Sequence, residues 1–376
     1  MRISCMQESL AKGLAIVGRA VATRSTLPIL SNIMLASDNG RLKLSATNLE
    51  IGINCWIGAK VDLDGAITLP ARILADLVNS LPPERIDLQL VVRTNTLNLK
   101  CGRLEANIKG NDAQEFPLIL VPDDEKPFLL KANVLHQMID QVAFAAAQDE
   151  SRPVLTGVLA DIGAESLTLA AADGYRLSVR KEIVVGVERE TSVVIPAKAL
   201  QELRRVNIAD DATVSMLISK NRNQVFFHLD DVDLVSQLVE GAFPDYKQII
   251  PTSYNTKTTL TTIDFLNAVR MAFIFARDAS NMVRVQVIPG GANVIGKVVV
   301  TATSPEHGDN VSELEATIEG APIEIAFNAR YLIDILSVIN APQVTLTTRD
   351  PASSGVFRPV DGTDLVHVVM PMHIGR

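Results

Sequence analysis

The chain has 376 residues, of which 47% are hydrophobic and 21% charged, and this is ample material for two or three packed domains. No run approaches the roughly 18 consecutive apolar residues that a membrane span needs. The N-terminus, MRISCMQESL, also lacks the apolar centre of a signal peptide. We therefore expect a soluble, cytoplasmic protein with no membrane partner.

The residues that usually bind metals or cofactors are few and scattered. Cys5, Cys55 and Cys101 are an odd number of cysteines, and each has apolar neighbours. This pattern favours buried free thiols over disulfides or a zinc site. The five histidines show no metal-ligand spacing, and aromatic residues make up only 4% of the chain. We predict no metal and no cofactor.

The net charge of −8 limits how the protein could hold nucleic acid. A protein that binds DNA by neutralising phosphates alone is normally basic. The charge therefore argues against a tight, contact-driven grip on DNA, although it leaves room for a local basic surface.

Short motifs recur at about one third of the chain length, and repetition of this kind indicates a repeat architecture. Any single echo could be chance, but all of them occur in the same order. The sequence therefore predicts three divergent copies of one unit. The echoes are LPIL at 27–30 with RPVL at 152–155, PAR at 70–72 with PAK at 196–198 and NAR at 328–330, and the prolines Pro117, Pro244 and Pro371.

The first copy shows the pattern that the others follow. An amphipathic helix is predicted over 7–21, because Leu10, Leu14 and later apolar residues fall on one stripe. The turn at 38–40, Asp-Asn-Gly, predicts a hairpin between short alternating strands. A second helix is predicted over 71–81, after a proline that suits a first turn.

The second copy repeats this plan with helices over 132–148 and 197–207, and the third with helices over 263–277 and 329–340. Polar, proline-containing stretches at 121–127 and 251–255 predict the linkers. We predict an α+β fold in which each copy packs two helices on antiparallel sheet. The expected domains are 1–122, 123–250 and 251–376.

The predicted helices are more basic than the rest of the chain. These six segments contain nine basic and six acidic residues, whereas the whole chain has 35 basic and 43 acidic residues. Lys12 and Arg19 are seven residues apart and so share one helix face. For any one helix, an ordinary solvated face explains this. Across six helices the bias favours a basic surface for a sequence-independent encounter with phosphates.

Common catalytic signatures are absent from the sequence, including GxxxxGK[ST], GxGxxG, GxSxG and HExxH. Ser9 and Lys12 form an isolated Ser-x-x-Lys match without its companion motifs. Asp230, Asp231 and Asp233 could bind a metal ion, but a polar hairpin between two apolar strands explains them as well. We predict no catalytic residue.

Two apolar features suggest a surface that binds another molecule. The segment 366–374 is apolar almost to the end of the chain, where residues are usually polar. Its methionines could line a groove for varied peptides, or the segment could simply be the last strand of a sheet. The segment 173–177, Asp-Gly-Tyr-Arg-Leu, would by itself be an ordinary hairpin turn.

Together with the threefold repeat, four motifs in order along the whole chain carry a family resemblance. The sequence resembles the bacterial DNA polymerase III beta subunits, the sliding clamps. These motifs are TLPIL at 26–30, AADGYRL at 171–177, GAFPDY at 241–246 and VVMPM at 368–372.

The resemblance implies three tandem copies of a DNA-clamp fold, with two chains joined head to tail in a closed homodimeric ring. Helices would surround duplex DNA, and sheets would form the outer wall. The chain would be a non-catalytic processivity subunit of the DNA polymerase III holoenzyme, which tethers the replicative polymerase. The clamp loader and other polymerases and repair proteins would share the same peptide-binding groove.

The resemblance also implies site residues. The peptide groove would lie between the second and third copies and contain Leu155, Ala172, Gly174, Tyr175, Arg176, Leu177, Pro244, Ile249, Ser354, Val368, Val369, Met370, Pro371 and Met372. The residues facing DNA would be Arg24, Gln148, Arg152, Lys198 and Arg205. The dimer interface would include Arg103, Ala106, Ile108, Phe273 and Ile274.

Three positions depart from the family pattern. Tyr175 stands where histidine is more common, and Pro153 and Val154 stand where some relatives carry two tyrosines. The chain also continues slightly further past Met372 than usual.

Two other functions remain possible from the residues alone. A metal-dependent nuclease would use the three aspartates at 230–233, and a general peptide-binding scaffold would have no role on DNA. Replacing the aspartates tests the first. Only a ring stays on closed circular DNA and slides off free ends, and this tests the second.

Overall fold

A computed structural model of the chain describes residues 1–117, 119, 127–184, 187, 190–219, 223–278, 280–291 and 294–373. The fold divides into two compact units, each described by itself. Unit 1 comprises Met1–Leu135 and Lys198–Leu238, and unit 2 comprises His136–Ala197 and Val239–Arg376. The predicted linker at 121–127 lies outside the described residues except for Pro127.

Unit 1 contains two antiparallel sheets. In spatial order, the five-stranded sheet is β5 (Ala59–Leu63), β1 (Arg2–Met6), β7 (Arg85–Val91), β8 (Thr96–Cys101) and β9 (Leu104–Lys109). The eight-stranded sheet is β10 (Phe128–Lys131), β15 (Thr213–Ser219), β16 (Gln224–Leu229), β17 (Val232–Gln237), β4 (Ile51–Ile57), β3 (Arg41–Thr47), β2 (Asn32–Asp38) and β6 (Ala66–Pro70).

Unit 2 is built on twelve strands paired in one continuous order. They are β14 (Thr191–Pro196), β11 (Gly157–Gly163), β12 (Ser166–Ala172), β13 (Arg176–Ile183), β25 (Leu365–Val369), β24 (Gly355–Pro359), β23 (Gln343–Thr348), β18 (Thr256–Thr261), β21 (Gly308–Gly320), β20 (Gly296–Ser304), β19 (Met282–Ile288) and β22 (Ile323–Asn328).

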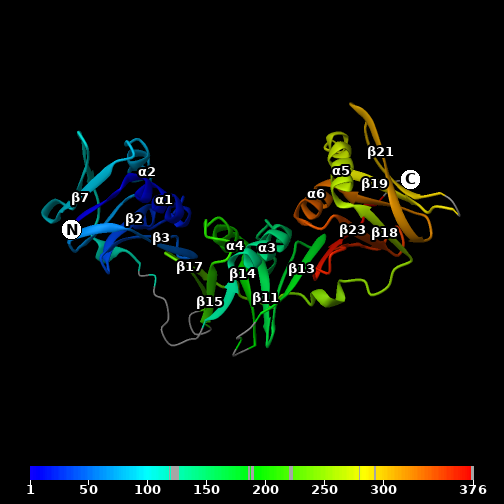
Figure 1. Ribbon diagram of the computed structural model, residues 1–376, viewed down its shortest axis with the longest axis horizontal. Helices are drawn as coiled ribbons and strands as arrows, with labels where there is room; N and C mark the ends of the chain where they lie inside the picture. The colour runs from blue at the N-terminus through cyan, green and yellow to red at the C-terminus, as the bar shows by residue number, and fades with distance from the viewer. Residues whose placement is uncertain are drawn as a thin grey trace. The chain divides into compact units, whose positions relative to one another are not determined.

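The six predicted helices are confirmed, with C-terminal ends a few residues earlier than expected in most cases. They are α1 (Gln7–Val17), α2 (Ala71–Asn79), α3 (Ala132–Val142), α4 (Ala197–Arg204), α5 (Thr262–Ala276) and α6 (Ala329–Val338). Short 3-10 turns, η1 (Gly18–Ala20) and η5 (Ala143–Ala145), continue α1 and α3. In Figure 1, α1 lies beside α2 and α5 beside α6, each pair against its own sheet. The α+β prediction is therefore correct.

The structure joins neighbouring copies of the repeat by the same strand pairing. β4 of the first copy pairs antiparallel with β17 of the second, with Ile53 opposite Leu234. β13 of the second copy pairs in the same way with β25 of the third, with Leu177 opposite Val368. Each junction therefore turns two sheets into one. Both junctions use the third strand of a consecutive antiparallel run, β2–β3–β4 or β11–β12–β13, and the last strand of the next copy.

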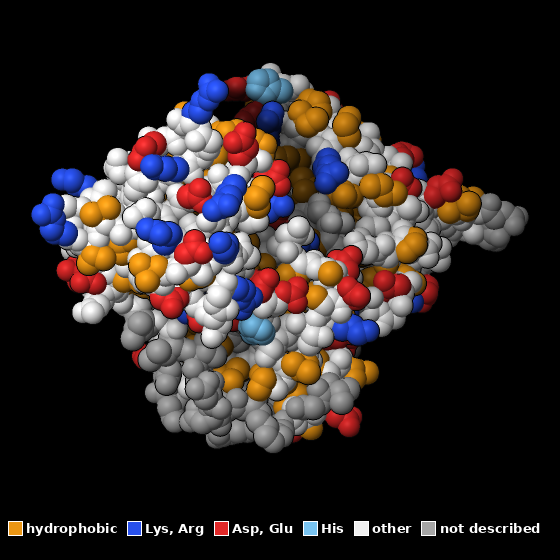
Figure 2. Space-filling view, turned by 60° about the vertical axis from the view of Figure 1, so that its left-hand side comes forward, with side chains coloured by type: hydrophobic (Ala, Val, Ile, Leu, Met, Phe, Trp, Pro, Cys, Tyr) orange, Lys and Arg blue, Asp and Glu red, His pale blue; other side chains and the backbone are white. Residues whose placement is uncertain are grey.

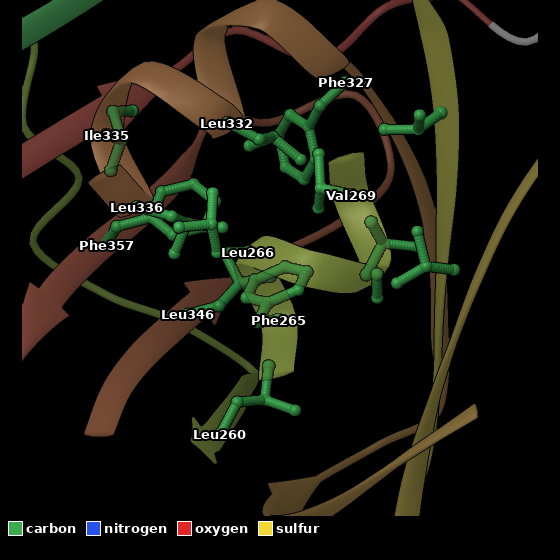
Figure 3. Packing of buried hydrophobic residues seen from close by; sticks show 14 of the residues in the cluster. Leu260, Phe265, Leu266, Val269, Phe327, Leu332, Ile335, Leu336, Leu346 and Phe357 are labelled. Atoms are coloured by element: carbon green, nitrogen blue, oxygen red, sulfur yellow. The ribbon is translucent and has the colours of Figure 1, made fainter. Parts of the chain in front are cut away.

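The core of the third copy shows why its helices sit where they do. Phe265 of α5 stacks on Phe357 at 6.5 Å between ring centroids, and Phe357 meets Phe327 edge-on at 6.0 Å. Leu332 and Leu336 of α6 complete the cluster that Figure 3 shows. Burial of each side chain of this size stabilises the fold by roughly 1.5–3 kcal/mol. The apolar stripes seen in the sequence thus fix both helices on the sheet.

The three cysteines are free and buried, as predicted. Burial raises the pKa of Cys5 to about 12 and that of Cys55 to about 11, with a smaller contribution from a nearby aspartate in each case. These thiols therefore stay protonated and unreactive at neutral pH. Within the described residues, no helix is long and apolar enough to cross a membrane.

Candidate functional site

Strand pairing in unit 2 gathers many of the residues predicted for the peptide groove. Ala172 lies opposite Leu177 in the β12–β13 ladder, and Leu177 lies opposite Val368 in the β13–β25 ladder. On the other side of β25, Val369 lies opposite Gly355, which follows Ser354. Strand order therefore places residues from sequence positions near 175, 355 and 368 side by side.

A small hydrophobic cluster underlies this part of the sheet. Ala172, Leu177 and Val368 belong to it together with Tyr246, and Phe243 and Ile250 pack against its edge. The segment that carries the predicted Pro244 and Ile249 is therefore held beside the sheet. Leu155 is buried in η6 (Pro153–Thr156), where its neighbour Val154 packs on the same cluster.

Three large apolar side chains at this place are exposed to solvent. The exposed fraction is 61% for Tyr175, 50% for Met370 and 44% for Ile249. The N–H of Met370 donates a hydrogen bond to the Tyr175 carbonyl oxygen over 2.9 Å, which joins the chain end to the turn. Exposed apolar groups above a buried apolar cluster are typical of a surface that binds a partner. We call Tyr175, Ile249, Met370 and the other residues predicted for the peptide groove the peptide surface.

The turn before β13 has a fixed geometry. The carboxylate of Asp173 accepts hydrogen bonds from the N–H groups of Tyr175 and Arg176, over 2.9 and 3.0 Å. Gly174 has a φ of +94°, and a Cβ at this position would lie 2.8 Å from Nη2 of Arg152. That nitrogen donates to the Asp173 carbonyl oxygen over 3.1 Å. Arg152, predicted to face DNA, therefore lies against the turn of the peptide surface.

The sequence did not indicate a buried histidine in β25, on the face of the sheet opposite Val368. His367 of β25 is fully buried, and neither ring nitrogen has a hydrogen-bond partner among the described residues. Burial, with a smaller contribution from the positive charge of Arg176, lowers the pKa of His367 to about 3. Its ring lies 5.8 Å from that of Phe144. A histidine inside an apolar strand gives no sequence signal that separates it from other core residues.

The residues predicted to face DNA are exposed and lie on loops or helix ends. Arg24 and Gln148 occupy equivalent loops, since Ala22 donates to Leu30 over 3.1 Å as Ala147 donates to Leu155 over 2.8 Å. Lys198 is in the first turn of α4, and Arg205 follows its last residue. Arg205 donates to Glu202 over 2.5 Å.

The helices themselves are less basic than the sequence suggested. Within the observed bounds, the six α-helices contain six basic and six acidic residues. The predicted excess comes from Arg19, Arg205 and Arg277, which lie just beyond the C-terminal ends of α1, α4 and α5. Cations are favourable there because the helix dipole is negative at that end. On the face seen in Figure 2, basic and acidic side chains are interspersed.

The residues predicted for the dimer interface lie at two separate places in the chain. Arg103 is in the β8–β9 turn, and Ala106 and Ile108 are in β9, the last strand of its sheet. Ile108 is only 6% exposed, because it faces its own core. Ile274 of α5 is 50% exposed, whereas Phe273 packs partly on the third-copy core.

The aspartates considered for a metal site form a hairpin turn instead. Asp230 and Asp231 are the two residues between β16 and β17, and Asp230 has a φ of +45°. The carboxylate of Asp231 pairs with Arg41, and that of Asp233 lies 2.6 Å from Nδ1 of His228. No group of three acidic, histidine or cysteine side chains suited to a metal exists among the described residues.

Comparison with known proteins gives one consistent result along the chain. Residues 1–120, 129–245 and 247–373 match, in turn, the N-terminal, central and C-terminal domains of the DNA polymerase III beta subunit. The beta sliding clamp of Synechocystis is 31% identical and that of Synechococcus elongatus 30%, with the whole of each chain covered in both cases.

Solved structures agree with this result. The DNA polymerase sliding clamp of Bacillus subtilis superposes with a TM-score of 0.94 at 26% identity, over the whole of both chains. The DNA polymerase III subunit beta of Pseudomonas aeruginosa gives a TM-score of 0.90 at 28% identity, also over both whole chains.

Proposed function

We propose how this chain, which belongs to the DNA polymerase III beta subunit family, carries out its function as a sliding clamp. The chain is a non-catalytic processivity factor of DNA replication. Two copies would close head to tail into a ring around duplex DNA, and the peptide surface of each copy would tether the polymerase.

The strand pairing between repeats supports the ring. Both observed junctions join the third strand of a consecutive antiparallel run to the last strand of the next copy, as β4–β17 and β13–β25. The remaining counterparts are the first half of β21, in the third copy, and β9, in the first. Among the described residues, Gly308–Ala316 of β21 pair only with β20, and β9 pairs only with β8. Open edges of this kind favour pairing with another chain.

Helix contacts at the junctions also support a head-to-tail ring. Arg19 follows the first helix of the first copy, and its Nε lies 3.8 Å from Oε2 of Glu202 in the second helix of the next copy. Gln141, at the end of the first helix of the second copy, donates to the Val338 carbonyl in α6 over 3.3 Å. By the same rule, the end of α5 would meet α2 of a second chain. Ile274 on α5 and Ile73 on α2 are 50% and 57% exposed, as such a contact requires.

DNA would be held by topology rather than by affinity. The proposed DNA contacts are exposed side chains, four of them basic, which would contact phosphates rather than bases. They are Arg24, Gln148, Arg152, Lys198 and Arg205. Their charges would give weak, sequence-independent and salt-sensitive binding. The acidic net charge of the chain is consistent with a ring that slides.

The peptide surface would bind short segments of partner proteins that carry a leucine and an aromatic residue. Burying about 300–400 Å² of apolar area offers roughly 8–10 kcal/mol before the costs of association. A micromolar dissociation constant is reasonable after those costs. The replicative polymerase, the clamp loader, and other polymerases and repair proteins would compete for this surface in the cytoplasm.

The pairing of Asp231 with Arg41 and of Asp233 with His228 supports the clamp over a nuclease, since it commits two of the three carboxylates to different partners. The repeated junction geometry supports the clamp over a scaffold without a role on DNA.

Sedimentation analysis of the pure protein tests the ring. A dimer at micromolar concentration is expected, and a strictly monomeric protein at high concentration would refute the proposal.

A further inference from the structure

The side chain of Arg176 is used inside the protein rather than offered to a partner. The side chain as a whole is only 11% exposed. Its Nε donates to Asp173 over 3.0 Å, its Nη1 to Asp334 over 2.5 Å, and its Nη2 to the Phe144 carbonyl over 2.9 Å. Every nitrogen of the group thus has an acceptor within the chain. The guanidinium is therefore held mainly by groups of its own chain.

Two aromatic rings hold the guanidinium in place. Its central carbon lies 4.4 Å from the ring centroid of Tyr331 and 5.2 Å from that of Phe144. The positive charge is attracted to the electron-rich faces of both rings. Phe144 belongs to the second copy of the repeat, and Tyr331 and Asp334 belong to α6 of the third. Arg176 therefore connects two copies at one point.

This point is connected to the peptide surface by hydrogen bonds. Asp173, which binds Arg176, also accepts the N–H of Tyr175 and so sets the shape of the turn. The carbonyl of Tyr175 in turn accepts the N–H of Met370. A continuous path therefore runs from Asp334 through Arg176 and the turn to the exposed chain end.

We propose that Asp334 is a positioning residue for peptide binding, which acts through Arg176 and makes no contact with the peptide. This inference rests on the proposed function. The Asp334 carboxylate fixes the guanidinium, the guanidinium fixes Asp173, and Asp173 fixes Tyr175 beside Met370. Loss of the Asp334 charge turns a charge-assisted hydrogen bond to Nη1 into a weaker neutral one. The turn then samples other positions, and pre-organisation of the peptide surface is lost.

The test uses the full-length protein and a synthetic polymerase-derived peptide that carries a leucine and an aromatic residue. Asp334→Asn should raise the peptide dissociation constant about 5- to 20-fold, as expected when a hydrogen bond between two charged groups is replaced by one to a neutral acceptor. Asp334→Glu, which keeps the charge, should restore most of the affinity. The matched control is Glu182→Gln, which removes the partner of Arg180 on the same strand and should leave affinity unchanged.

A double-mutant cycle separates positioning from direct contact. In an Arg176→Met background, Asp334→Asn should cause no further loss of affinity, because its effect passes through the missing guanidinium. Additive losses would mean that Asp334 touches the peptide, and unchanged affinity of Asp334→Asn alone would also overturn the inference. If the unaltered protein fails to bind the peptide, the proposed function fails instead.

Discussion

The amide of Met370 and the carbonyl of Tyr175 are joined by a hydrogen bond of 2.9 Å, although 195 positions separate them in the sequence. This bond continues the β13–β25 ladder by one step beyond its last pair, Arg176 with Val369. It brings two exposed apolar side chains together at the junction of the second and third copies.

Deletion of Met370–Arg376 should abolish peptide binding. It removes the Met370 side chain and the hydrogen bond from Met372 to the Ala326 carbonyl, but leaves β25 intact. Fluorescence anisotropy with a labelled polymerase peptide measures the loss, and sedimentation should show an unchanged dimer. Deletion of residues 374–376 alone is the control and should leave affinity as it was. Unchanged affinity of the longer deletion would show that the surface is misplaced.

Glutamate at Ile274 should dissociate the dimer. Burying an unpaired carboxylate at an interface costs several kcal/mol by order of magnitude. Ile274 is half exposed within the chain, so the fold of the single chain should tolerate the change, and adding Phe273→Glu should strengthen the effect. Ile263→Glu, at the other end of α5 and 55% exposed, is the control. A variant with both glutamates that stays fully dimeric at micromolar concentration would refute this placement.

Replacing Arg24, Lys198 and Arg205 with alanine should weaken DNA binding without changing stability, because exposed charges add little to folding. The slope of log affinity against log salt should fall by about one for each phosphate that the variant no longer neutralises. A matched triple replacement on the sheets, Lys60, Lys100 and Arg284 to alanine, should have a smaller effect. Equal losses in the two triple variants would contradict the assignment of the DNA-facing side chains.

Burial of His367 should make the protein less stable in mild acid. The folded pKa, about 3, lies below the ordinary value of 6.5, so the unfolded chain binds more protons between these pH values. Stability therefore falls as the pH falls through this window, by roughly 2 kcal/mol between pH 6.5 and 5. Urea unfolding of the His367→Gln variant should show a weaker pH dependence over that range. An equal dependence in both proteins would show that His367 is not buried in the neutral form.

The repeat and its helices were predictable because they depend on local patterns. The LPIL and RPVL echoes mark equivalent loops, each closed by a hydrogen bond from an alanine to the last leucine of the motif. Helix ends were less predictable. The apolar stripe of the first helix runs to Val21, but the α-helix ends at Val17 and gives way to a 3-10 turn. The predicted excess of basic residues in the helices was wrong for this reason.

The surroundings of Arg176 could not be predicted from the sequence. Its partners Phe144, Tyr331 and Asp334 lie 32 to 158 positions away, and no spacing rule connects them. The resemblance placed Arg176 in the peptide groove, and only the folded chain shows that its guanidinium points to internal acceptors. The ion pair that Asp231 forms with Arg41 could not be predicted either, because it depends on the β4–β17 junction, which brings the two residues close.

Retention on circular and linear DNA tests the sliding clamp most directly. The labelled protein is placed on nicked circular plasmid with its clamp loader and ATP, and free protein is removed by gel filtration. A restriction enzyme then linearises half of the sample. We predict that the protein stays with the circles and dissociates from the linear molecules, because a closed ring slides off free ends. Equal retention on both forms, or no retention on circles, would contradict the account.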